Sequence, residues 1–110
     1  HVLVDGCVYF HSNPRGYKAE LLAQNPRVCL TAVADVHAIP MRFTTEYSSA
    51  IAFGTARLVH DPAERRRALS AICEKYAASN PHREKCAANA GPETAVYCVE
   101  IESITGKRSE

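Results

Sequence analysis

Apolar residues open the chain in two short runs that are separated by a turn. Residues 1–4 and 7–11 flank Asp5-Gly6, a dipeptide typical of the two-residue type I′ turn of a β-hairpin. Both runs are almost entirely apolar, which is the pattern of strands that are covered on both faces. The sequence therefore predicts an N-terminal β-hairpin that packs on both sides.

Residues 27–34 and 43–60 carry the next two strand patterns. The first run is mostly apolar. The second alternates with a period of two, so small residues share one face and the other face carries Tyr47, Ser49, Ile51 and Phe53. Gly54 on the small-residue face indicates a bend or a close backbone approach.

A last strand is predicted at residues 95–102, which end in alternating apolar and acidic positions. Prolines and glycines without clear periodicity predict loops at residues 35–42 and 80–94, the second with one short helical turn. Residues 104–110 are predicted to form a polar tail.

Two segments carry helix signals. Asn13-Pro14 supplies an N-cap residue and a first-turn proline for a helix over residues 16–24, which Asn25-Pro26 ends. The residues expected on its buried side are Tyr17, Leu21 and Leu22.

The second helix begins at Asp61-Pro62, where Asp61 is the N-cap and Glu64 completes an arrangement resembling a capping box. Its core-facing residues recur at helical spacing and are Leu69, Ile72, Cys73 and Tyr76. Strands joined by hairpin-scale turns, with helices inserted, predict a mainly β fold: an antiparallel barrel with peripheral helices.

Composition narrows the function class. The 110 residues are 46% hydrophobic and 23% charged, with a formal net charge of +1, which is ordinary for one folded domain. A net charge near zero gives no indication of nucleic-acid binding, and no apolar run reaches the length of a membrane span. The five cysteines form no Cys-x-x-Cys pair, so no metal site, reduced thiols and a cytoplasmic location are expected.

Two cations stand where a helix ordinarily disfavours them. Arg15 and Lys18 precede the first acidic residue, Glu20, although a helix N-terminus carries partial positive charge and unpaired N–H groups. A bound phosphate would neutralise the two cationic side chains and accept hydrogen bonds from the unpaired N–H groups. The alternative is two solvated side chains that cost a few tenths of a kcal/mol.

Several short motifs follow one another in order. They are Tyr9-Phe10-His11, Gly16-Tyr17-Lys18, Leu21-Leu22, Asn25-Pro26-Arg27-Val28-Cys29, Tyr47-Ser48-Ser49, Phe53-Gly54-Thr55-Ala56-Arg57-Leu58-Val59, Asp61-Pro62 and the final Ile104-Thr105-Gly106-Lys107. Together they cover almost the whole chain and resemble the pyridoxamine 5′-phosphate oxidase-related flavoproteins, nearest the nitroimidazole-resistance (Nim-like) branch. This resemblance implies one antiparallel split β-barrel domain over residues 1–110, which binds FMN at a homodimer interface. Family members begin with a helix and further strands that precede the hairpin, so we expect an N-terminal segment to be missing.

The resemblance also implies a cofactor site. Lys18 matches the family position that holds the FMN phosphate, and Phe10 and His11 match strand-end residues beside the cofactor. Oxidase-type relatives have Ser-Arg-Lys where this chain has Gly16-Tyr17-Lys18, so Tyr17 cannot supply their second cation. Its hydroxyl or backbone N–H can still reach the phosphate, and the nearby Arg15 is a candidate replacement cation.

Ser49 stands where these relatives direct an amide side chain to the flavin, and it is equally explained as a small strand residue. His11 is the candidate catalytic residue, as a proton donor near the flavin ring, with a strand-end polar residue as the alternative. The leading hypothesis is therefore an FMN-dependent oxidoreductase that reduces a small electron-poor substrate, such as a nitroaromatic. Two alternatives stay open: a flavin-binding protein without substantial turnover, and a haem-binding or haem-degrading split barrel with His11 as axial ligand.

Overall fold

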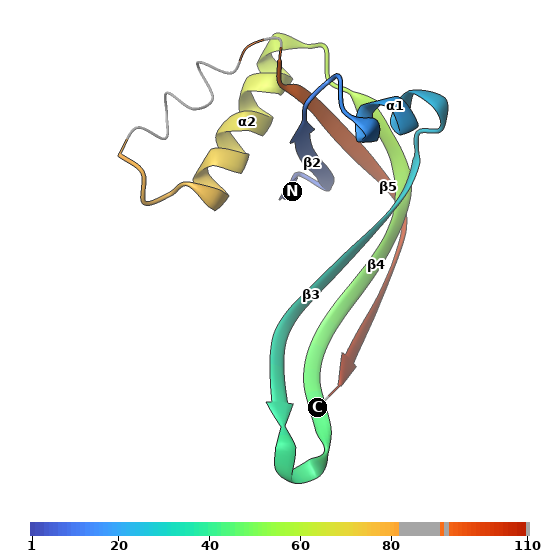
Figure 1. Ribbon diagram of the computed structural model, residues 1–110, viewed down its shortest axis with the longest axis vertical. Helices are drawn as coiled ribbons and strands as arrows, with labels where there is room; N and C mark the ends of the chain where they lie inside the picture. Colours follow the sequence, from blue (N-terminus) through green and yellow to red (C-terminus); the bar gives the residue numbers. More distant parts are fainter. Residues whose placement is uncertain (82–90, 92, 110) are drawn as a thin grey trace.

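The described residues form one antiparallel sheet and two α-helices (Figure 1). The sheet curls into half of a split β-barrel. The computed structural model describes residues 1–81, 91 and 93–109. The strands β1 (Val2–Val4), β2 (Cys7–Ser12), β5 (Ala95–Ser109), β4 (Thr44–Leu58) and β3 (Arg27–Ile39) are hydrogen-bonded in this order. The predicted fold class is confirmed.

The N-terminal hairpin forms as predicted. Asp5 and Gly6 both take positive φ, 49° and 80°, as a type I′ turn requires. Coverage on both faces is confirmed in β2, where Val8 and Tyr9 are buried, and is wrong in β1, where Leu3 is 65% exposed.

The helix α2 (Pro62–Tyr76) begins as the sequence predicts. The Asp61 carboxylate accepts a hydrogen bond from the Glu64 N–H at 3.2 Å, with proline in the first turn. Leu69, Ile72 and Cys73 are buried, but Tyr76 is 60% exposed. Its predicted core position is wrong, because it lies at the last helical residue.

The helix α1 (Tyr17–Gln24) begins later than its predicted cap. Asn13 does not cap it: the Asn13 side-chain oxygen accepts from the Arg15 N–H at 2.9 Å, and Gly16 is the N-cap without a side-chain bond. None of its residues is buried, and Tyr17 is 74% exposed. The predicted buried face is therefore wrong for Tyr17 and Leu21, whereas Leu22 does pack beside the core.

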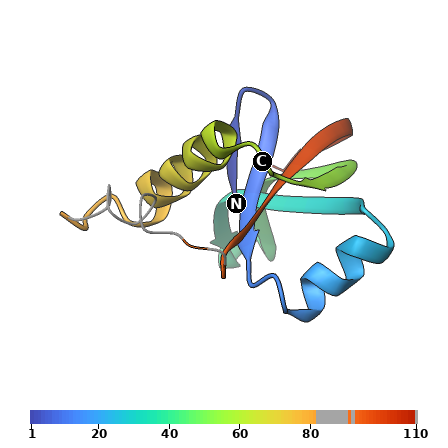
Figure 2. The same cartoon turned by 90° about the horizontal axis from the view of Figure 1, so that it is seen from above.

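The core occupies both faces of the sheet at one end. Tyr9, Val96 and Cys98 pack with Leu69 of α2 on one face, and Val8, Ala56 and Val99 pack near α1 on the other. Figures 1 and 2 show α1 and α2 on opposite sides of β2. This end of the sheet is therefore a three-layer core.

Gly54 makes the close approach that its position predicted. A Cβ on Gly54 would clash with the Glu100 carbonyl oxygen, and the pairing of β4 with β5 shifts register between Phe53 and Gly54. The missing side chain therefore lets the two strands meet at this bulge.

The other end of the sheet is a bare arm, which we define as residues 31–39, 44–51 and 103–109 (Figure 1). It overturns two predictions, since residues 35–39 continue β3 before the 3-10 turn η1 (Pro40–Arg42), and residues 104–109 continue β5. A bulge lies between Ala34 and His37, with Asp35 at φ 54°. It interrupts the alternation of side chains between the two faces of β3, so the sequence pattern did not indicate a strand there. No residue of the arm is buried.

The predicted loop at residues 80–94 lies mostly outside the described residues, as does Cys86. Cys7, Cys29 and Cys98 are free thiols, whereas Cys73 is disulfide-bonded. The expectation of reduced thiols is therefore wrong for Cys73, and the cytoplasmic location stays a prediction. Among the described residues, no helix combines the length and apolarity needed to cross a membrane.

Candidate functional site

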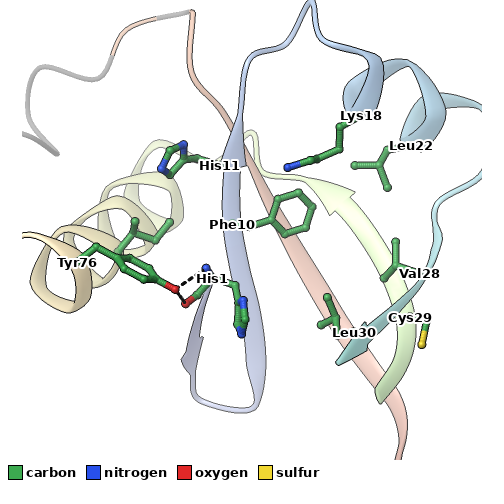
Figure 3. Close-up of a pocket in the computed structure, with 10 residues that line it drawn as sticks. His1, Phe10, His11, Lys18, Leu22, Val28, Cys29, Leu30 and Tyr76 are labelled. Atoms are coloured by element: carbon green, nitrogen blue, oxygen red, sulfur yellow. Dashed lines mark hydrogen bonds between the residues drawn. The ribbon is translucent and has the colours of Figure 1, made fainter. Parts of the chain in front are cut away.

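A cavity of about 430 Å³ lies at the core end of the molecule, and Figure 3 shows its lining residues on both sides of β2. Its wall combines residues of β2, both helices and β3. The lining residues are His1, Phe10, His11, Lys18, Leu22, Val28, Cys29, Leu30, Ile72 and Tyr76. Mostly apolar walls with a few polar groups are typical of small-molecule sites of this size.

Lys18 enters the cavity because of the turn that precedes α1. The Gly16 N–H donates to the Asn13 carbonyl at 3.1 Å, which closes a tight turn directly after β2. The helix begins one residue later, so Lys18 is its second residue. Figure 3 shows the Lys18 side chain directed from α1 toward Phe10.

Phe10 forms the aromatic wall of the cavity. Its ring stacks on Tyr97 of β5, with centroids 5.1 Å apart and 13° between the planes. The Lys18 ammonium lies 5.7 Å from the centre of the Phe10 ring, on the scale of a cation–π contact. One cation and one aromatic surface therefore lie together in the cavity.

His11 follows Phe10 on β2 and pairs with Val96. Successive side chains of a strand point to opposite faces, and Figure 3 shows His11 on the α2 side of β2, with Phe10 on the α1 side. His11 is exposed and lines the cavity, so its imidazole is accessible to a molecule bound there.

The structure brings together three of the six predicted site residues: Phe10, His11 and Lys18. Arg15 and Tyr17 are exposed and do not line this cavity. Ser49 lies in the arm, paired with Val33 and Lys107, away from the other five. The binding roles of Arg15, Tyr17 and Ser49 stay predictions.

Sequence reasoning missed most of the apolar wall. Leu22, Val28 and Leu30 line the cavity together with Ile72 and Tyr76 of α2. Val28 and Leu30 alternate along β3, so a period-two pattern placed them on one face. Nothing local indicated that α2 would reach the same cavity.

An electrostatic network centred on Glu64 lies outside this cavity. The Glu64 carboxylate accepts from Arg57 Nη1 and Nη2 at 2.9 and 2.7 Å and from the Tyr9 hydroxyl at 2.7 Å. These bonds, Arg57 first, lower the pKa of Glu64 from 4.5 to about 2. The Glu64 side chain is therefore used in this network and not in the predicted capping box.

Within the described part of the chain, no group of three His, Cys, Asp or Glu side chains is placed to hold a metal ion. The cavity fits a different kind of ligand. Its apolar and aromatic walls suit a flat ring system, and the Lys18 ammonium suits an attached anion.

Comparison with known proteins points to one family. The family model for pyridoxamine 5′-phosphate oxidase matches residues 1–108. No curated protein sequence matches the chain.

Solved structures share the fold. A Bacteroides thetaiotaomicron protein named for 5-nitroimidazole antibiotic resistance has a TM-score of 0.71 and 24% identity, over 94% of this chain and 62% of its own. A FAD-binding protein from Mesorhizobium loti has a TM-score of 0.68 and 20% identity, over 98% and 72%. A flavocytochrome from Azotobacter vinelandii has a TM-score of 0.66 and 21% identity, over 98% and 52%. The chain thus spans less than two thirds of the length of the first of these relatives.

Proposed function

The chain belongs to the pyridoxamine 5′-phosphate oxidase family, and on that premise we propose that it binds a flavin, specifically FMN, in the cavity beside β2. The observation that carries this proposal is the pairing of the Lys18 ammonium with an aromatic and apolar wall in one cavity. Two structural relatives are named as flavoproteins, a FAD-binding protein and a flavocytochrome. FMN differs from riboflavin in its phosphate, which is the group that Lys18 would hold.

The residues divide the binding work. Lys18 would pair with the phosphate, and the first N–H groups of α1, which have no partner within the helix, would support it. Phe10, Leu22, Val28 and Leu30 would exclude water from the ring. When bound, the flavin supplies the electron and hydride transfer.

We further propose that the protein is an oxidoreductase acting on a small electron-poor substrate, such as a 5-nitroimidazole or another nitroaromatic. The support is the structural relative named for resistance to that class and the apolar walls, which favour a flat, weakly polar molecule. In its imidazolium form, His11 would donate an N–H proton as the substrate is reduced, which would leave the neutral imidazole.

A homodimer is part of this proposal, because the described part of the chain buries no residue of the arm. The radius of gyration is 16.5 Å, whereas about 13 Å is usual for 110 residues. Met41 and Phe43 at the end of the arm are 91% and 99% exposed. Apolar surface of this kind is typical of protein contacts, and a second copy would also bring Ser49 toward a shared flavin.

The first experiment is the absorption spectrum of freshly purified protein. Bound flavin gives absorption bands close to those of free flavin. A Soret band would instead favour the haem alternative, in which His11 is the axial ligand. Reduction by NADH or NADPH without oxygen, followed by addition of a nitroimidazole, then tests turnover. A flavin that is reduced and never reoxidised by the nitro compound would refute the enzyme and leave the flavin-binding protein.

A further inference from the structure

The Lys18 ammonium rests against a fixed aromatic surface. Phe10 and Tyr97 face each other directly across β2 and β5, and their rings are nearly parallel at 5.1 Å. Tyr97 is 8% exposed, so core packing holds its ring, and stacked aromatic rings stabilise each other. The Phe10 ring is therefore held by the sheet.

Lys18 itself comes from a much less anchored element. No residue of α1 is buried, and Lys18 is exposed. A long lysine side chain has many rotamers, and fixing it in one of them costs conformational entropy. The contact of its ammonium with Phe10, at 5.7 Å, restricts that freedom in advance of any ligand.

The charge of Lys18 is also left available. The ion pairs found among the described residues join Arg27 and Arg57 to glutamates, and none of them involves Lys18. A cation that is held by a ring and not by a carboxylate keeps its full charge for an anion.

We propose that the stacked pair Phe10–Tyr97 positions the Lys18 ammonium for the flavin phosphate, and this inference rests on the flavin-binding function proposed above. Phe10 and Tyr97 act as positioning residues, because the phosphate bond is made by Lys18. The pair raises the affinity for FMN relative to riboflavin, which lacks the phosphate.

The test is the ratio of dissociation constants for riboflavin and FMN, measured by flavin fluorescence quenching at one salt concentration. Packing changes affect both ligands, so the ratio isolates the phosphate. Phe10→Leu removes the aromatic face, and the preference for FMN should fall about two- to fivefold, as for loss of one exposed cation–π contact. Phe10→Tyr retains the face and should keep the wild-type ratio.

Tyr47→Leu is the matched control. It removes another lysine–aromatic contact, that of Lys107 at 5.8 Å, which lies in the arm. Its ratio should equal that of the wild type. An unchanged ratio in Phe10→Leu, or an equal fall in Tyr47→Leu, would overturn the inference.

The wild-type protein supplies a second measurement in case Phe10→Leu does not fold. The ring current of Phe10 should shift the ε-methylene protons of Lys18 upfield in the NMR spectrum, and the shift should persist when FMN is added. Its loss on FMN binding would overturn the positioning role while leaving flavin binding intact. A wild-type protein that binds neither FMN nor riboflavin would overturn the proposed function, and this inference with it.

Discussion

Replacing Glu64 by Gln should destabilise the protein, because this carboxylate of α2 joins the helix to two strands of the core end. It follows the Asp61 cap of α2 and accepts three hydrogen bonds of 2.7–2.9 Å, two from Arg57 of β4 and one from Tyr9 of β2. Arg57 in turn bonds Glu100 of β5 at 2.9 Å. The Glu64 side chain is only 14% exposed, so its charge is poorly compensated by water.

The magnitude follows from the pKa of Glu64. Its fall from 4.5 to about 2 in the folded protein corresponds to at most about 3 kcal/mol. The Arg57 side chain is 43% exposed, and solvent screening reduces the expected contribution to about 1–2 kcal/mol. Because the folded pKa is depressed, this stability is present above pH 4.5 and is lost as the pH falls toward 2.

Urea unfolding followed by circular dichroism, at fixed protein concentration and at several pH values from 7 to 3, measures both effects. Glu64→Gln should unfold at lower urea at pH 7, and the difference from the wild type should shrink as the pH falls below 4.5. Glu100→Gln is the matched control: it removes a partner of the same arginine whose side chain is 63% exposed, and it should cost less than about 1 kcal/mol. Equal stability of Glu64→Gln and the wild type across this range would refute the reasoning.

Three further outcomes are expected. Gly54→Ala should destabilise the protein by about 1–3 kcal/mol or more in urea unfolding, because the new Cβ would clash with the Glu100 carbonyl oxygen. Gly106→Ala is the control and should be tolerated, because its Cβ would lie 3.6 Å from the nearest backbone oxygen. Equal effects of the two substitutions would contradict the close approach of the strands at Gly54. Asp61→Ala should cost about 0.5–2 kcal/mol through loss of its bond to the Glu64 N–H, and an unchanged Tm would argue against the cap. His11→Ala should lower nitroreductase turnover about a hundredfold with little change in the dissociation constant of FMN, and a fully active variant would reduce His11 to a strand-end residue.

Elements that depend on neighbouring residues could be predicted from the sequence. Asp5-Gly6 requires only its own backbone geometry to make a hairpin, and Asp61-Pro62 requires only the first turn of α2. Both formed as expected. Asn13 carried a similar local signal, but its side chain bonds the Arg15 N–H and so completes a turn before the helix.

Elements that depend on distant partners could not be predicted. The polar residues 104–109 form a strand because β4 lies beside them, and their polarity reflects an arm open to solvent. In the site, local charge indicated Lys18 and a family motif indicated Phe10. Ile72 reaches the cavity through the packing of α2, and Tyr97 is placed against Phe10 by strand pairing. Ser49 matches a family motif, yet it lies in the arm and does not line the cavity of its own chain.

Titration of the purified, flavin-free protein with FMN, alongside Lys18→Ala, tests the central claim most directly. The wild type should bind FMN saturably. The dissociation constant of Lys18→Ala for FMN should be about tenfold higher or more, because a charge-assisted contact with the phosphate is lost. Equal affinity of the two proteins for FMN would contradict the account.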